Sequence, residues 1–270
     1  MRHPFFSSTM LVATGFVIVA ALALAPAVAQ APSPPPAPAP VPAPVKPGPY
    51  KIVAIKPPAV VSDPSFEAFR KELAGIAQKK DRAALAKLVA ATFFWVPEDS
   101  DVADKSKPAI DNLAKAIRLE SKDGLGWEVL TEYAGETTAM PDAQRQGVIC
   151  SPGEPTFDDK AADELANATQ TDSSDWVYPV HDGVEVRSGP QPDAAMIEKL
   201  GLHLVRALED ESPANAVMAT ALKVMTPSGK MGYVPVETMR AVVGPQMCYL
   251  KDAGGWKIAG FVGGDASAAN

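Results

Sequence analysis

The sequence predicts an α+β fold in which a helical domain is followed by a small antiparallel β-barrel and an added C-terminal hairpin. Two patterns carry this prediction. Apolar residues recur at helical spacing over residues 63–172, whereas short strand-like runs separated by turn residues occupy residues 173–245. A third observation limits the folded part: ten of the 27 prolines lie between Pro32 and Pro49, and so dense a run cannot pack as a core.

The overall composition is that of an ordinary globular protein. A hydrophobic content of 47% with 21% charged residues excludes a disordered chain, a collagen and a multi-span membrane protein. The 25 basic and 32 acidic residues give a net charge of −7, which argues against a broad nucleic-acid-binding surface. We therefore expect no nucleic-acid partner.

Residues 1–29 have the form of a secretory signal peptide. Arg2 gives a basic start, residues 10–25 form an almost unbroken apolar run, and an A-x-A cleavage pattern ends at Ala29. The run is shorter than the roughly 20 residues that a membrane-spanning helix needs. We expect cleavage, no membrane span after it, and a periplasmic or secreted location; an uncleaved anchor is the alternative. Residues 30–62 then form a proline-rich linker, either a disordered tether or a polyproline-II strut.

Five helices are expected in the helical domain. Asp63 followed by Pro64 forms a pair typical of a helix start, and Thr156 with Asp159 forms a capping box. The regularly spaced aromatic and aliphatic side chains of these helices are expected to form the core. Asp81 is a second candidate cap. The helices are expected over residues 64–78, from Asp81 into the cluster Phe93-Phe94-Trp95, from about Ser106 to Ile117, over residues 124–134 and from Thr156 to about Ala168.

An acidic loop follows the second predicted helix. Asp99, Asp101 and Asp104 carry hard oxygen ligands of the kind that calcium prefers. The EF-hand pattern, however, needs glycine at its sixth position and glutamate at its twelfth, where this chain has Asp104 and Ile110. We interpret the loop as a solvated surface segment, and expect neither a metal site nor a cofactor.

The part of the chain after residue 173 carries a series of short motifs in a fixed order. They are Val186-Arg187-Ser188-Gly189-Pro190, Ile197 with Leu200-Gly201, Lys223-Val224 and the hairpin Ser228-Gly229-Lys230-Met231-Gly232-Tyr233-Val234. With these motifs, about residues 176–240 resemble the bacterial SH3-like (SH3b) domain. The resemblance implies an SH3-like barrel that binds a peptide or cell-wall fragment, although the tryptophan that often precedes the Lys-Val pair in that family is Ala221 here. No family resemblance is found in the helical domain.

The two cysteines predict a disulfide. Cys150 lies at the end of the helical domain and Cys248 lies in the C-terminal hairpin, over residues 246–264. An even number of cysteines in an exported chain favours pairing, because the compartment is oxidising. Two buried free thiols are the alternative.

The usual catalytic signatures are missing from the sequence. It contains no nucleophile elbow, phosphate-binding loop, dinucleotide fingerprint, C-x-x-C or H-E-x-x-H motif. Cys150 with His181, or Cys248 with His203, could form a nucleophile pair, but a disulfide explains both cysteines better. We predict that the protein is not an enzyme.

Two classes of function remain. In the first, the protein is an exported, non-enzymatic component of the cell envelope whose SH3-like domain binds a peptide, a cell-wall fragment or a protein partner. In the second, it is an accessory or inhibitor protein whose helical domain carries the function, while the barrel is structural. For the first class, the candidate binding residues are Trp176, Tyr178, Arg187 and Tyr233.

Overall fold

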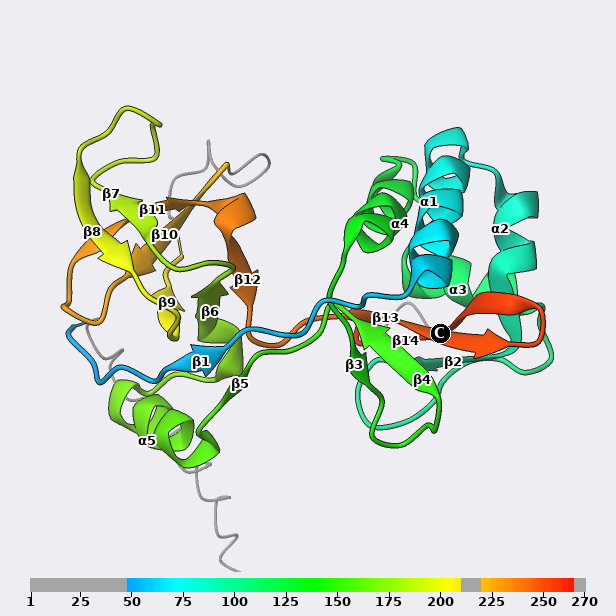
Figure 1. Cartoon of the computed structure of the whole chain (residues 1–270), viewed down its shortest axis with the longest axis horizontal. Coiled ribbons are helices and arrows are strands. Elements are labelled where there is room, and N and C mark those ends of the chain that lie inside the picture. Colours follow the sequence, from blue (N-terminus) through cyan, green and yellow to red (C-terminus); the bar gives the residue numbers. More distant parts are fainter. Residues whose placement is uncertain (1–47, 210–219, 265–270) are drawn as a thin grey trace, which may run out of the picture. The chain divides into compact units, whose positions relative to one another are not determined.

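The computed structural model describes residues 48–209 and 220–264. The predicted signal peptide and residues 30–47 of the predicted linker lie outside these ranges. Within them, the chain forms three β-sheets of two, five and seven strands, together with five α-helices (Figure 1). Of the described residues, 29% are helical and 32% are in strands, so β-structure leads.

The five-stranded sheet has the strand order β2-β14-β13-β4-β3. Its neighbouring strands are antiparallel except for β14 and β2, which run parallel. The C-terminal hairpin therefore supplies two inner strands of this sheet. The bounds are β2 (Val89–Val96), β3 (Met140–Pro141), β4 (Val148–Ser151), β13 (Gln246–Asp252) and β14 (Gly255–Val262).

Four helices cover one face of the five-stranded sheet (Figure 1). Asp63 accepts a hydrogen bond from the backbone N–H of Ser65 at 2.7 Å and caps the first helix, and Asp81 caps the second by accepting from Ala84 at 2.9 Å. The helix-facing core includes Trp95, and most of its other members come from the four helices and three strands. The helices are α1 (Pro64–Lys79), α2 (Arg82–Leu88), α3 (Ala109–Ala116) and α4 (Leu125–Gly135).

The seven-stranded sheet has the order β12-β6-β9-β10-β11-β7-β8. All seven strands contribute side chains to a single apolar core on one face, so the sheet must curl around that core. The strands are β6 (Trp176–Pro179), β7 (Val184–Arg187), β8 (Met196–Leu200), β9 (Val205–Ala207), β10 (Ala221–Met225), β11 (Met231–Pro235) and β12 (Met239–Ala241).

The opposite face of the seven-stranded sheet is covered in part by the N-terminal segment and by one helix. These elements share a second apolar cluster with β6, built around Val53, Leu165 and Trp176. They comprise β1 (Ile55–Lys56) and β5 (Thr156–Phe157), which form the two-stranded sheet, and α5 (Asp159–Thr169); two short 3-10 helices, η1 (Ser173–Asp175) and η2 (Val236–Thr238), complete the elements.

The predicted fold class is wrong. Among the described residues, β8 and β12 are the two edges of the seven-stranded sheet and do not pair with each other, so no closed barrel forms. The hairpin 246–264 is not an addition to a barrel, because it lies inside the five-stranded sheet. The predicted helical domain also contains strands β2 to β5, and α5 packs with the seven-stranded sheet.

Two local predictions also need correction. The segment that was expected to continue the second helix into Phe93-Phe94-Trp95 is the strand β2, because its aromatic side chains alternate between two cores and its backbone pairs with β14. The fifth helix is capped by Asp158, which accepts from the N–H of Ala161 at 3.0 Å, and not by Thr156.

The chain passes between the two larger sheets three times. Elements β1, β5, α5 and β6 to β12 belong with the seven-stranded sheet, whereas α1 to α4, β2 to β4, β13 and β14 belong with the five-stranded sheet. Neither group is a continuous stretch of sequence. No helix in the described ranges is both long enough and apolar enough to cross a membrane.

Candidate functional site

The four predicted binding residues all lie on one face of the seven-stranded sheet, opposite its curled core. Trp176 pairs with Arg206, which pairs in turn with Met225 on β10. Two residues earlier on β10, Lys223 pairs with Tyr233, and Tyr233 also pairs with Arg187 on β7. Because directly paired residues, and residues two apart on one strand, share a face, these rows form one surface.

Half of this surface is covered by the chain itself. Trp176 and Tyr178 are only 4% and 3% exposed. The indole N–H of Trp176 donates to the hydroxyl of Thr171 at 2.9 Å, and its ring contacts the ring of Tyr50 edge to face, with centroids 5.2 Å apart. Burial raises the pKa of Tyr178. Both side chains are therefore core residues and do not present a free binding surface.

Tyr50 holds the N-terminal segment, which covers Trp176, against the seven-stranded sheet by hydrogen bonds. Its hydroxyl donates to the carbonyl of Met225 at 2.8 Å and accepts from the backbone N–H of Arg206 at 3.2 Å. Its own N–H donates to the carbonyl of Pro227 at 3.1 Å. Burial raises the pKa of Tyr50, which keeps the hydroxyl protonated as a donor. A segment of the chain thus occupies the place where an outside peptide was expected.

The other half of the surface is open. Here Met196, Arg187, Tyr233 and Lys223 stand at directly paired positions on β8, β7, β11 and β10, in that order. Met231 lies next to this row, on the same face of β11. Met196 is 50% exposed and Met231 is 59% exposed. We call these five side chains the open strip.

The polar groups of the open strip differ in their partners. The Arg187 guanidinium forms an ion pair with Glu185 and donates to the carbonyl of Ala194 at 2.8 Å, so its position is fixed. The ammonium group of Lys223 and the hydroxyl of Tyr233, in contrast, have no hydrogen bond or ion pair within the described residues. A ligand lying across β10 and β11 would meet these two unused groups beside a fixed cation.

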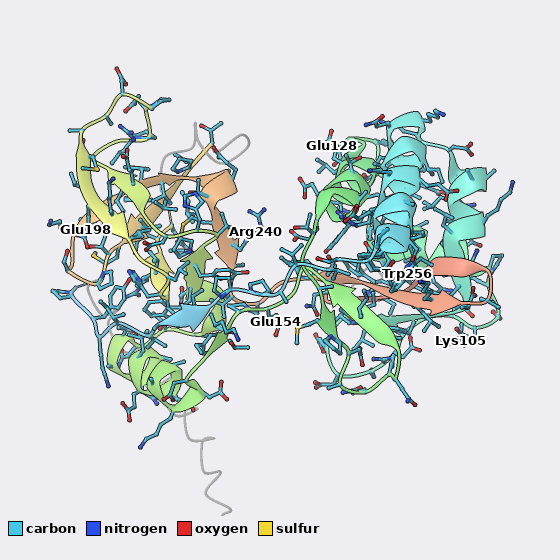
Figure 2. All side chains as sticks on the ribbon, viewed as in Figure 1. Lys105, Glu128, Glu154, Glu198, Arg240 and Trp256 are labelled. Atoms are coloured by element: carbon cyan, nitrogen blue, oxygen red, sulfur yellow. A yellow bond between two sulfur atoms is a disulfide. The ribbon has the colours of Figure 1, made fainter. Side chains whose placement is uncertain are left out.

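The turn between β10 and β11 is held in place below the strip. The Glu198 carboxylate on β8 accepts from the hydroxyls of Ser228 at 2.6 Å and Thr226 at 3.1 Å, and lies 3.6 Å from the Lys230 ammonium (Figure 2). Gly232 allows β11 to lie close to β7, because a Cβ there would be 2.5 Å from Val186. The strip is therefore built on a rigid part of the sheet.

The sequence analysis named Arg187 and Tyr233, which lie in the open strip, but did not name Lys223, which lies beside them. Lys223 is part of the Lys-Val pair that supports the family resemblance, and its pairing with Tyr233 was the available signal. Ala221, where the family often has tryptophan, pairs with Pro235. This end of the row consequently offers small side chains and no aromatic groove.

The acidic loop does not gather its carboxylates around a shared point. Asp101 accepts from the backbone N–H groups of Trp95 and Ala103 at 2.9 and 3.0 Å, and its second oxygen binds the Lys105 ammonium at 2.8 Å (Figure 2). Asp104 accepts from Ser106. Donors of the protein itself therefore use these oxygens.

The proposed nucleophile pairs are not formed. The exposed His181 has its Nδ1 2.9 Å from the carbonyl of Asp182, and the buried His203 has its Nδ1 3.0 Å from the carbonyl of Leu204. Both cysteines are joined in one disulfide, as predicted, so neither sulfur is a free nucleophile.

The disulfide joins directly opposed residues of β4 and β13. Cys150 and Cys248 are register partners, with Cα atoms 4.0 Å apart and a sequence separation of 98. Asp142 lies close to both sulfurs. Because the sulfurs are bonded to each other, this group is not a set of metal ligands in the oxidised protein.

Comparison with protein-family models, with curated proteins and with solved structures found no match for this chain. The proposals below therefore rest on the residues and their geometry.

Proposed function

We propose that the protein is an exported, non-enzymatic binding protein of the bacterial cell envelope, and that the open strip binds a peptide, a cell-wall fragment or a protein partner. One observation carries this proposal: the Lys223 ammonium and the Tyr233 hydroxyl, which have no hydrogen bond or ion pair within the described residues, stand beside Arg187 on the sheet face opposite the curled core. The disulfide is consistent with an oxidising compartment, and the predicted signal peptide supports export.

The chemistry of the strip favours an extended ligand that carries carboxylate groups. Arg187 and Lys223 flank the Tyr233 ring; Arg187 is paired with Glu185, whereas Lys223 has no ion-pair partner among the described residues. A ligand carboxylate can be bound by the Lys223 ammonium, while the tyrosine ring and the exposed methionines contact apolar parts. Tyrosine and arginine side chains commonly contribute most of the binding energy of an interface.

Co-sedimentation with purified peptidoglycan, together with titration of its isolated stem peptides, tests the proposal. We expect Tyr233→Ala and Lys223→Gln each to weaken binding about tenfold, which is the effect of a typical interface anchor. Lys160→Gln on the exposed face of α5 is the matched control and should bind like the natural protein. Equal binding by the natural protein and Tyr233→Ala would count against the strip.

Export is tested separately by the N-terminal sequence of the protein recovered from the envelope or medium. We expect it to begin at Gln30, directly after the predicted cleavage site. A sequence that begins at Met1 would contradict cleavage and favour the uncleaved anchor.

A second candidate function is an accessory or inhibitor protein that works through α1 to α4, with the seven-stranded sheet as a structural support. The coverage of Trp176 and Tyr178 by the Tyr50 segment favours it, because half of the expected binding face is unavailable. A partner that is captured equally well by the natural protein and by a Tyr233→Ala, Lys223→Gln double variant would favour this candidate.

A further inference from the structure

The disulfide occupies the middle of a row that crosses the whole five-stranded sheet. Phe94, Gly260, Cys248, Cys150 and Met140 are successive register partners on β2, β14, β13, β4 and β3. The row lies on the sheet face that the four helices leave free, where a separate small cluster holds both cysteines. A Cβ at position 260 would lie 2.4 Å from the Phe94 ring, so glycine makes room for that ring beside the disulfide.

Asp142 is held with one carboxylate oxygen toward the disulfide. Its Oδ1 accepts from the backbone N–H groups of Gln144 and Arg145, both at 2.7 Å. Its Oδ2 lies 3.8 Å from the Sγ of Cys150 and 3.2 Å from the Arg145 guanidinium. The side chain is only 9% exposed, so water screens its charge poorly.

Arg145 completes the cover over this part of the sheet. Its guanidinium lies 3.8 Å above the centre of the Phe94 ring while it pairs with Asp142. Cys150 and Cys248 are 3% and 0% exposed beneath these groups. The Asp142 carboxylate oxygen lies within 4.8 Å of both sulfurs, so negative charge directly adjoins the disulfide.

Reduction of a disulfide builds negative charge at this place. A thiolate attacks one sulfur, the bond between Cys150 and Cys248 breaks, and the other cysteine leaves as a thiolate that takes up a proton. A second thiol then attacks the mixed disulfide, which releases the first cysteine and leaves the reagent oxidised to its own disulfide. In each transfer, the charge is shared by the attacking, central and leaving sulfurs.

We propose that Asp142 makes the Cys150–Cys248 disulfide a charge-selective site of thiol exchange, which cationic thiols reduce readily and anionic thiols reduce slowly. Whichever cysteine is attacked, the charge of the transferring sulfurs develops next to the fixed Oδ2. A thiol that brings a further carboxylate adds repulsion, whereas a thiol that brings an ammonium group offsets it. The site therefore selects the redox partner by charge as well as by access.

The test compares three thiols on the folded, full-length oxidised protein: mercaptoacetate, 2-mercaptoethanol and cysteamine. Reduction is followed by alkylation and mass spectrometry, and each rate is divided by the rate of the same thiol with a small, uncharged reference disulfide. We expect Asp142→Asn to raise the corrected rate with mercaptoacetate about tenfold and the rate with cysteamine less than threefold. Asp252→Asn is the matched control, because Asp252 also caps a turn of this sheet through a backbone N–H.

The dependence on thiol charge separates electrostatic control from simple loosening. If Asp142→Asn only opened the sheet or lowered global stability, the rate would rise by one common factor for all three thiols, and the proposal would be overturned. Unchanged rates with all three thiols would overturn it as well. Asp252→Asn should leave the ratio between mercaptoacetate and cysteamine as it is in the natural protein.

Discussion

Two tyrosine hydroxyls illustrate how much one polar atom depends on its surroundings. Tyr249 is 0% exposed under α1, next to Phe66 and Phe69, and its hydroxyl has no hydrogen-bond partner among the described residues. Burial raises its pKa. The Tyr50 hydroxyl, in contrast, both donates and accepts. The same deletion should therefore have opposite consequences at the two positions.

We expect Tyr50→Phe to lower the free energy of unfolding by about 1–2 kcal/mol, because two buried backbone groups lose their partner. Tyr249→Phe should leave it unchanged or raise it by up to about 1 kcal/mol, because an unpaired hydroxyl leaves the core. Urea unfolding of both variants measures this difference. A clear loss of stability in Tyr249→Phe would show that its hydroxyl is satisfied.

Asp63 links the start of α1 to solution pH. The Ser65 hydroxyl and N–H donate to its carboxylate, the Lys251 ammonium lies 3.3 Å away, and together they lower the pKa of Asp63 to about 2. A lowered pKa means that the ionised form stabilises the fold, fully above about pH 4 and less and less as pH falls through 2.

Asp63→Asn keeps an acceptor oxygen but removes this ionisation. The variant should be less stable than the natural protein at pH 7, and the difference should shrink steadily between pH 4 and pH 2. Thermal unfolding across this range measures it. A difference that stays constant down to pH 2 would contradict the link to Asp63.

Local signals of one or a few residues were predictable from the sequence. The caps Asp63 and Asp81 were recognised because a cap depends only on residues within the next turn. The disulfide was predicted because two cysteines leave a single possible pairing. The burial of Trp176 was not predictable, since it depends on Tyr50, more than a hundred residues earlier in the chain.

At the scale of elements, Gly232 in β11 and Gly75 in α1 differ in the space available for a side chain. In β11, a Cβ on Gly232 would lie 2.5 Å from Val186 and 2.6 Å from the carbonyl oxygen of Arg187. In α1, a Cβ on Gly75 would have no neighbour within 4 Å. The first glycine is required by the neighbouring strand, whereas the second only weakens its helix.

Gly232→Ala should lower the free energy of unfolding by about 1–3 kcal/mol, because the strands must separate or shift. Gly75→Ala should raise it by about 0.5–1 kcal/mol, because alanine favours a helix interior. Guanidinium unfolding of the two variants checks both signs. A stable Gly232→Ala variant would show that β7 can move away from β11 at little cost.

The error at β2 shows why apolar patterns mislead for single elements. Leu85, Leu88 and Val89 continue at helical spacing into an aromatic cluster, yet the helix ends at Leu88. Phe93 and Trp95 then face the helices while Phe94 faces the disulfide, which is the alternation of a strand. The partner that decides this, β14, lies more than 150 residues away in sequence.

At the scale of the whole molecule, the disulfide links two paired strands of the five-stranded sheet that lie far apart in sequence. It joins β4 to β13, which are separated by all the elements of the seven-stranded sheet. Replacing both cysteines with serine should lower the free energy of unfolding by about 3–5 kcal/mol. Without the disulfide, the unfolded chain is no longer closed into a long loop and has a higher conformational entropy. Denaturant unfolding of the oxidised protein and the double variant measures the loss; equal midpoints would contradict it.

Sequence patterns did not predict which strands pair with one another in each sheet. Periodicity indicates strands and helices, but it does not say that residues 246–262 pair with residues before 152 rather than with the adjacent strands. The predicted closed barrel was wrong because its edge strands β8 and β12 do not pair, although the individual strands were mostly in place. Of the candidate site, the sequence indicated Arg187 and Tyr233, which lie in the open strip, but it did not indicate that Trp176 and Tyr178 are covered.

Because β13 and β14 are inner strands of the five-stranded sheet, this sheet can be completed only after they have been synthesised. The helices α1 to α4 are synthesised early, but their sheet lacks two of its three inner strands until residues 246–262 have been made. Tyr249, Ile258 and Phe261 complete the core against which those helices pack. A chain that ends before residue 246 therefore has these helices without the finished sheet against which they pack in the folded protein.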